Sequence, residues 1–277
     1  MRVERYDDPA AFWRDAQAFL ERDEIGNTQL LAIGSRHASD SGKSPPVCYA
    51  VTSAGEVVAA AVMTHTGTLF LSPADTAQLS VLHDSIAAAE SHVGDIVAEV
   101  ATAQAYAQLT GIRYAVHVGL RLYRLEAVSP VPVVAGALRA ADDGDFELLC
   151  RWQQAFLDEI AARETGETSA QMVRRRLASG GAWLWEVDGA PVAHAGHRPT
   201  PIRSARIAPV YTLPDQRGKG YAGALVAAVC RELLAAGRHP LYLFADALNP
   251  SANGIYQRVG FHEVGEHVHL MRADTAH

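Results

Sequence analysis

Along the chain, hydrophobic residues recur either at the spacing of a helix or at that of a strand, most regularly in the second half. Apolar residues recur at helical spacing in FELLCRWQQAFLDEIAA, TSAQMVRRRLASGG and AGALVAAVCRELLAAG, and Asn249-Pro250 begins a short fourth helix. Strand patterns are found in GALRAADD, AWLWEV, PVAHAGH, ARIAPVYT, LYLFAD and HVHLMR. The predicted order is therefore strand, helix, helix, three strands, helix, strand, helix, strand.

The first half repeats this order in a weaker form. Helical spacing is found in AFWRDAQAFLERD, DTAQLSVLHDSIAAAES and TAQAYAQLTG, and strand patterns in VCYAVT, EVVAAAVM, TLFLSP, DIVAEV and RLYRLEAV. Both halves predict an α/β fold, of the α+β kind in which one mixed sheet contains parallel and antiparallel strands. The two prolines of SPVPVVAG, residues 129–136, resist helix and central strand. We therefore expect one domain at residues 1–130 and a second at 131–277.

Composition narrows the class of protein. The 277 residues are 49% hydrophobic and 20% charged, which is typical of globular domains. A formal net charge of −7 provides no basic field for nucleic acid. Apolar runs such as Val57–Met63 are far shorter than the ~20 residues of a membrane span, and the acidic amino terminus is unlike a signal peptide. The sequence thus predicts a cytoplasmic protein that binds neither nucleic acid nor membranes.

Metal binding is not expected. The three cysteines, at positions 48, 150 and 230, are far apart and form no C-x-x-C pair. Two histidine pairs, His194 with His197 and His267 with His269, have no acidic or cysteine ligand at a spacing typical of a metal site. We predict that no metal takes part in function.

The stretch LPDQRGKGYAG, residues 213–223, contains the spacing G-x-G-x-x-G. In a dinucleotide-binding fold the first glycine follows its strand immediately, whereas here residues 213–217 intervene. A Walker phosphate loop is excluded, because Lys219 is followed by Gly220 instead of serine or threonine. Since Asp246 ends the next strand near the distance expected for a ribose-binding acid, a dinucleotide oxidoreductase stays as an alternative.

The segments PVYTLPDQRGKGYAGALV and LFADALNPSANGIYQRVGF resemble the GNAT superfamily of acyl-CoA-dependent N-acetyltransferases, over roughly residues 136–272. The duplication resembles tandem GNAT proteins, in which the amino-terminal copy is commonly degenerate. Consistent with this, no glycine-rich loop follows TLFLSP in the first half. Asp215 departs from the family loop, which often has Gln or Arg three residues before its first glycine. The resemblance implies two tandem GNAT-like acyl-CoA N-acyltransferase domains, the second of which binds acetyl-CoA.

The resemblance also implies roles for individual residues. Backbone amides of the glycine loop and helix start would bind the coenzyme pyrophosphate, the preceding strand would pair with the pantetheine arm, and an asparagine would contact the coenzyme. These cofactor-binding positions are Val210, Tyr211, Thr212, Arg217, Gly218, Lys219, Gly220, Tyr221, Ala222 and Asn249. The catalytic positions are Val210, whose amide would polarise the thioester carbonyl, and Tyr256, whose phenol would protonate the departing thiolate.

The implied reaction is direct attack of a neutral amine on acetyl-CoA in a ternary complex. The acceptor is expected to be a small molecule, an amino acid or a peptide amino terminus. The strand IAPVYT lacks the glutamate that many family members use as a base, so Glu186, His194, His197 and water all remain as candidates. A non-catalytic acyl-CoA-binding module is the other alternative.

Overall fold

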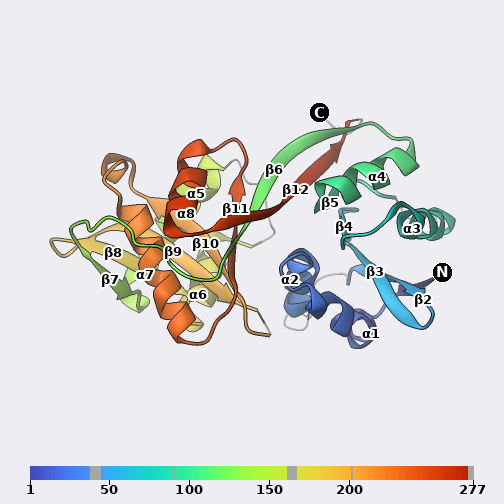
Figure 1. The fold of residues 1–277 in the computed structure, drawn as a ribbon, viewed down its shortest axis with the longest axis horizontal. Helices are drawn as coiled ribbons and strands as arrows, with labels where there is room; N and C mark the ends of the chain where they lie inside the picture. Colours follow the sequence, from blue (N-terminus) through green and yellow to red (C-terminus); the bar gives the residue numbers. More distant parts are fainter. Residues whose placement is uncertain (38–44, 90–91, 161–166, 201, 274–277) are drawn as a thin grey trace. The chain divides into compact units, whose positions relative to one another are not determined.

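The computed structural model describes residues 1–37, 45–89, 92–160, 167–200 and 202–273 (Figure 1). The chain divides into two compact units. Unit 1 comprises Met1–Arg121, Asp246–Leu248 and Gly265–His277, and unit 2 comprises Leu122–Ala245 and Asn249–Val264. In each unit, helices cover both faces of a mixed arrangement of parallel and antiparallel strands.

Unit 1 contains the elements of the first half of the chain and the end of the last strand. The elements are β1 (Arg2–Tyr6), α1 (Pro9–Arg22), α2 (Thr28–His37), β2 (Val47–Ser53), β3 (Glu56–Met63), β4 (Leu69–Leu71), α3 (Thr76–Ala88), β5 (Ile96–Glu99), α4 (Val100–Thr110) and β6 (Tyr114–Leu125). The strand order is β1-β2-β3-β4-β5-β12, where β12 (His262–Arg272) is the last strand of the chain, with β4 and β5 parallel and the other paired strands antiparallel.

The core of unit 1 follows the two-residue period of its strands. On β2, Cys48 and Ala50 face α1 and α2, whereas Tyr49 and Val51 face α3 and α4. Because the sheet is covered on both sides, these strands are apolar at nearly every position and do not alternate.

Unit 2 is built from the second half in the same way. Its elements are β7 (Ala137–Ala140), α5 (Phe146–Glu159), α6 (Ser169–Ala178), β8 (Ala182–Val187), β9 (Ala190–Pro199), β10 (Ala205–Thr212), α7 (Tyr221–Ala235), β11 (Leu241–Asp246), α8 (Pro250–Val259) and β12 (His262–Arg272), with short 3₁₀ turns at Asp143–Asp145 and Pro214–Gln216. The strand order is β6-β11-β10-β9-β8-β7, and β10 and β11 are parallel.

Two apolar layers cover the sheet of unit 2. Helix α7 is buried along Leu225, Val229 and Leu233 against one face, together with Phe261. Helices α5 and α6 cover the other face through Trp152 and further apolar side chains. This arrangement places the amino terminus of α7 beyond the end of β10, where the glycine loop connects them (Figure 1).

The predicted mixed α/β fold is confirmed, and the element order of residues 137–272 agrees with the prediction. With β1 and α2 included, the first half has the same order as the second. Both were missed by pattern alone. The strand β1 is mostly exposed and polar, because it pairs with one neighbour, β2. The helix α2 is short and contains Gly34, a residue that disfavours helices.

The compact units do not follow the chain order at their edges. Residues from Gly265 onward belong to unit 1, where β12 pairs with β5 from His267 to Leu270. Unit 2 begins within β6, at Leu122. The division into domains 1–130 and 131–277 therefore stays a prediction, and the last strand is the part of the chain that the linear division does not anticipate.

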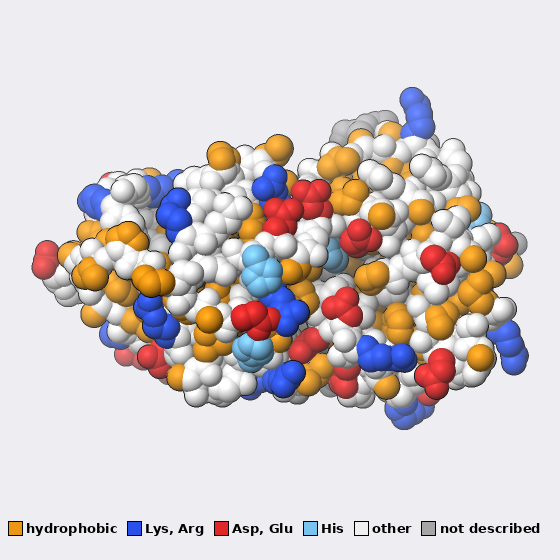
Figure 2. Space-filling model, viewed as in Figure 1, with side chains coloured by type: hydrophobic (Ala, Val, Ile, Leu, Met, Phe, Trp, Pro, Cys, Tyr) orange, Lys and Arg blue, Asp and Glu red, His pale blue; other side chains and the backbone are white. Residues whose placement is uncertain are grey.

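The face in Figure 2 carries acidic and basic side chains interspersed, without a continuous basic area. Within the described residues, no group of three or more His, Cys, Asp and Glu side chains is placed to hold a metal ion. Among the helices that the structure describes, none is long and apolar enough to cross a membrane.

At the end of α8, the backbone of Gly260 lies close to that of Ala127, so a side chain at position 260 should destabilise the fold. Gly260 has φ +112°, and a Cβ there would lie 2.8 Å from the Ala127 carbonyl oxygen. We expect Gly260→Ala to lower the free energy of unfolding by about 2–3 kcal/mol, measured by urea unfolding. Gly189→Ala is the matched control, because φ is +77° there with open space around it. That control should lose only about 1 kcal/mol, and equal losses would contradict the close approach.

Candidate functional site

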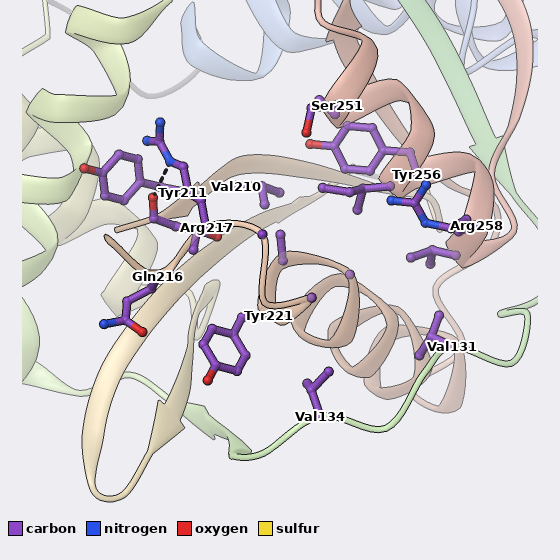
Figure 3. Close-up of a pocket in the computed structure, with 18 of the residues that line it drawn as sticks. Val131, Val134, Val210, Tyr211, Gln216, Arg217, Tyr221, Ser251, Tyr256 and Arg258 are labelled. Carbon is purple, nitrogen blue, oxygen red and sulfur yellow. Dashed lines mark hydrogen bonds between the residues drawn. The ribbon is translucent and has the colours of Figure 1, made fainter. Parts of the chain in front are cut away.

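A cavity of about 490 Å³ lies in unit 2, within the size range of small-molecule sites (Figure 3). It is lined by the end of β10, the glycine loop, the first turn of α7, one face of α8 and residues 131–134. Ten of the eleven site residues predicted from the sequence line it: Val210, Tyr211, Thr212, Arg217, Gly218, Gly220, Tyr221, Ala222, Asn249 and Tyr256. Lys219 does not, and its ammonium donates instead to Gln216 Oε1 at 2.9 Å.

The cavity opens where β10 and β11 separate. The two strands pair at Ala205 with Leu241 and at Arg206 with Tyr242, near their beginnings. On the other side, β10 continues its pairing with β9 as far as Thr212. The β9–β10 register shifts between Ile207 and Val210, around Pro209, which has no amide to donate. Val210–Thr212 are consequently paired on one edge and lie beyond the β10–β11 ladder on the other.

The direction of the Val210 amide follows from the ladder. Leu213 donates its amide to the Val192 carbonyl of β9 at 3.2 Å. Because amides point alternately to the two edges of a strand, the amides of Val210 and Thr212 point away from β9. They face the opening on the β11 side, where an extended ligand can add as a strand.

The glycine loop presents a cluster of free amides at the start of α7. Gly218 and Gly220 have φ of +76° and +87°, and Gly220 caps the helix without a side chain. Among the described residues, the amides from Gly218 to Gly223 have no hydrogen-bond acceptor, and the first helical bond is that of the Ala224 amide to the Gly220 carbonyl at 3.1 Å. Free amides and the positive end of the helix dipole together favour a bound anion.

The corresponding helix of unit 1 is closed in the same position. At the start of α3, Asp75 accepts the Gln78 amide at 2.8 Å, and the Gln78 side chain accepts the Asp75 amide at 3.0 Å. This capping box occupies the amides of Asp75 and Gln78 and puts a negative charge where an anion would bind. The first half therefore lacks the anion site that the glycine loop forms in the second.

Arg217 is held away from an anion. Its Nε donates to the Thr212 carbonyl at 3.0 Å, its Nη2 pairs with the Glu159 carboxylate, and its guanidinium lies 5.8 Å from the centre of the Tyr211 ring (Figure 3). Its amide donates to the Pro214 carbonyl at 3.4 Å in the 3₁₀ turn. The sequence-based expectation that this amide is free for pyrophosphate is therefore not supported by the geometry.

Tyr256 on α8 lies at the cavity, with its ring centre 6.3 Å from Tyr123 and 6.1 Å from Phe261. Burial, with a smaller contribution from the nearby Cys230 thiol, raises the pKa of Tyr256 to about 12. The phenol is therefore protonated throughout the neutral range. The Tyr256 hydroxyl has no hydrogen-bond partner in the described part of the chain.

Two further polar groups line the cavity. The Asn249 side chain accepts the Ala252 amide at 3.0 Å and caps α8, so its position is fixed by the helix. The Thr212 hydroxyl is buried and has no partner among the described residues. A buried hydroxyl without a partner is costly in the absence of a ligand that bonds to it.

None of the three side chains considered as a base lines the cavity. Glu186 accepts from Arg139 Nε at 2.8 Å, in a network with Asp145. His194 is fully buried, and desolvation with the nearby Arg176 charge lowers its pKa to about 3. Burial also lowers the pKa of His197, whose Nδ1 accepts from the Trp183 indole at 3.0 Å. These side chains are structural in the present geometry.

Several cavity residues were not predicted from the sequence. They are Val131, Pro132, Val134, Glu159, Gln216, Gly223, Ser251, Ala252, Ile255, Arg258 and Val259. Those on α8 follow from helical spacing around Tyr256, since Ala252, Ile255 and Val259 lie on the same face. No sequence signal identified residues 131–134, because their proximity to α7 and α8 depends on the path of the chain.

Residues 146–261 match the family model described as "Acetyltransferase (GNAT) family". No protein with a curated function matches the chain in sequence.

Solved structures share the fold over nearly the whole chain. A GNAT-family acetyltransferase from Colwellia psychrerythraea aligns with a TM-score of 0.70 and 10% identity, over 98% of this chain and 100% of that one. A GCN5-related N-acetyltransferase from Sphaerobacter thermophilus aligns with a TM-score of 0.63 and 17% identity, over 98% of this chain and 96% of that one. A tandem GNAT protein from the clavulanic acid biosynthesis pathway aligns with a TM-score of 0.55 and 13% identity, over 97% of this chain and 98% of that one.

The fold likeness and the family match agree with the arrangement of β10, the glycine loop and α7. The chain therefore carries a GNAT-family acetyltransferase domain at residues 146–261, within a fold that it shares end to end with GNAT acetyltransferases, including a tandem GNAT protein.

Proposed function

We propose that the protein is an acetyl-CoA-dependent N-acetyltransferase whose acceptor is a primary amine of a small molecule, an amino acid or a peptide. The observation that carries the proposal is the set of unpaired amides from Gly218 to Gly223, which open into the cavity that Val210 and Tyr256 line. Amides at a helix start suit a pyrophosphate, and the free edge of β10 suits the extended pantetheine arm. No metal is needed for this chemistry.

The coenzyme would lie with its thioester where β10 parts from β11. The Val210 amide points to that opening and donates to the thioester carbonyl oxygen, which gains negative charge as the amine attacks. The Thr212 amide, which points to the same side of β10, is available to the pantetheine arm. Both residues belong to the segment that the β10–β11 ladder leaves free.

In the proposed reaction, the lone pair of a neutral amine forms a bond to the thioester carbon. The tetrahedral intermediate collapses as the carbon–sulfur bond breaks, and the sulfur takes its proton from the Tyr256 hydroxyl. The surplus proton of the new amide passes to water, and the tyrosine regains a proton from solvent. Burial disfavours a bare thiolate as it disfavours a phenolate, so a hydrogen bond from Tyr256 stabilises the developing charge on sulfur.

Water is the proposed acceptor of the amine proton. Glu186, His194 and His197 do not line the cavity, and the cavity carboxylate of Glu159 is paired with Arg217. The rate should therefore rise with pH as the neutral fraction of the amine increases, up to the pKa of the acceptor itself.

Calorimetric titration with acetyl-CoA is the primary test. We expect saturation at one site per chain, because the Asp75 carboxylate occupies the start of α3, the corresponding position of the first half. NADH is expected not to bind. Binding of NADH alone would favour an oxidoreductase and overturn the proposal. Two acetyl-CoA sites per chain would show that the first half is not degenerate.

A glycine substitution at the start of α7 tests the anion site. Gly220→Ala places a methyl group at the cavity beside the free amides, and acetyl-CoA should bind at least about tenfold more weakly, or ~1.4 kcal/mol. Gly237→Ala is the control, because it follows the other end of α7 with φ +78° and open space. Both variants carry a similar backbone strain. Equal affinities in the two variants would remove the pyrophosphate assignment.

The leaving-group assignment is tested with Tyr256→Phe. We expect kcat to fall by about 10²-fold or more, with coenzyme affinity within about twofold of the parent. Tyr123→Phe is the matched control, since its buried hydroxyl has no partner in the described residues and its ring adjoins Tyr256. Full turnover in Tyr256→Phe would exclude the phenol as the acid.

In the parent, kcat should show no loss between about pH 7 and pH 10, because the raised pKa of Tyr256 keeps its acid form present.

A further inference from the structure

We propose that the acceptor is a primary amine that also carries a carboxylate, as an amino acid does, and that Arg176 binds this carboxylate. The inference rests on the proposed function and narrows its acceptor to one class. Its basis is the side chain of Arg176 on α6, whose guanidinium forms no hydrogen bond or ion pair with the described residues.

The guanidinium of Arg176 is partly withdrawn from water. The side chain is half-buried, and its Nη1 is fully buried without a partner in the described part of the chain. Burial, together with the nearby charges of Arg175 and Arg198, lowers the pKa of Arg176 to about 10. Because a buried charge without a counterion destabilises a fold, a cation kept in this position points to an anion that binds to it.

The side chains near Arg176 do not supply the missing negative charge. Arg175 is positive and is itself paired with the Glu167 carboxylate. Burial, and then the charge of Arg176, lower the pKa of His194 to about 3, so this histidine is neutral. Its Nδ1 donates to the Trp183 carbonyl at 3.0 Å. A neutral imidazole cannot balance a guanidinium, and the charge of Arg176 stays uncompensated within the described part of unit 2.

Arg176 crosses β9 at the place where the β9–β10 register shifts. A Cβ at Gly196 would lie 2.6 Å from Arg176 Nε and 2.6 Å from the Ala208 carbonyl oxygen, so only glycine leaves space for both groups. The preceding residue, Ala195, pairs with Val210. Because paired Cα atoms lie about 5 Å apart, the guanidinium is roughly 10 Å from the Val210 backbone, where the thioester is proposed to bind.

The guanidinium and the coenzyme lie toward opposite faces of the sheet. Ala195 packs in the core under α7, so Gly196, its neighbour on β9, faces α5 and α6 together with Arg176. The cavity reaches this second face as well, since Tyr211 lines it and packs in the core under α5 and α6. An acceptor can therefore approach the thioester from the face of Arg176, while the pyrophosphate is bound at the start of α7.

The distance between the two groups fits a small molecule with charges at both ends. A hydrogen bond of about 3 Å to Arg176 and an attack distance of about 3 Å at the thioester leave only a few ångströms between carboxylate and amine. Guanidinium binds a carboxylate with two parallel hydrogen bonds and so fixes its orientation. An amino acid has this separation, whereas the terminal carboxylate of a peptide lies farther from its amine. The geometry therefore favours an amino acid over a peptide.

The experiment measures acetyl transfer by the full chain to amino acids, β-alanine and γ-aminobutyrate, and to the amide of each, which has the same amine and no carboxylate. The best acid should have a kcat/KM at least about 10²-fold above that of its amide. Because the amine of the amide is less basic, its neutral fraction is larger, and protonation alone would favour the amide. Equal values for acid and amide, or transfer to no acid in the set, would overturn the inference.

Arg176→Met removes the charge and keeps a long side chain. The variant should lower kcat/KM for the acid by about 10²-fold, to the value of the amide, with the amide rate and the affinity for acetyl-CoA within about twofold of the parent. Arg175→Met is the matched control, because its charge is already paired with Glu167, and it should keep the preference for the acid. Equal losses toward acid and amide, or the same loss in Arg175→Met, would exclude Arg176 as the carboxylate ligand.

A stability measurement separates binding from a structural role. Since Arg176 has no partner among the described residues, Arg176→Met should leave the urea midpoint of unfolding unchanged or raise it. A clear fall in the midpoint would show that Arg176 stabilises the fold, against the inference. If the parent binds no acetyl-CoA, the proposed function itself fails. If the parent acetylates amides as fast as acids, the proposed function holds and only the carboxylate assignment fails.

Discussion

The separation of β10 from β11 after Arg206 is the constraint on which the site depends. Parallel strands normally share every backbone hydrogen bond along their common length, and here the ladder ends while β10 continues to Thr212. The register shift around Pro209 allows β10 to stay on β9 as it leaves β11. The result is a short strand edge, inside the unit and facing a cavity, whose amides have no sheet partner. An edge of this kind is ready to accept an extended ligand.

The two halves show how a small difference in capping decides whether a helix start can bind an anion. In both, a strand leads into a helix that packs on the sheet, as β4 does into α3 and β10 into α7. Asp75 closes the first helix start with its own carboxylate. Gly220 leaves the second open, and its left-handed conformation allows the chain to turn without a side chain. The same architecture therefore supports an anion site in one copy and excludes it in the other.

Most of the charged side chains at and near the cavity form ion pairs within the protein. Arg217 is joined to Glu159, and Arg139 to Glu186 and Asp145. Burial keeps His194 neutral and Tyr256 protonated. Few charges are left for a ligand, so the proposed binding depends mainly on the backbone amides. It also explains why acidic and basic residues near the site in sequence were poor guides to its chemistry.

Hydrophobic periodicity by itself determined most of the secondary structure, because buried faces of helices and strands leave their spacing in the sequence. The glycine loop and the N-P pair were equally local, since left-handed turns and helix starts depend on single residues. The polar edge strand β1 and the short helix α2 carry weak local signals and were missed. Only the tertiary structure decided that β12 joins β5, that the three candidate bases lie outside the cavity and that residues 131–134 line it. Strand pairing, desolvation and the path of a connecting segment depend on residues far apart in the chain, and a local pattern contains no record of them.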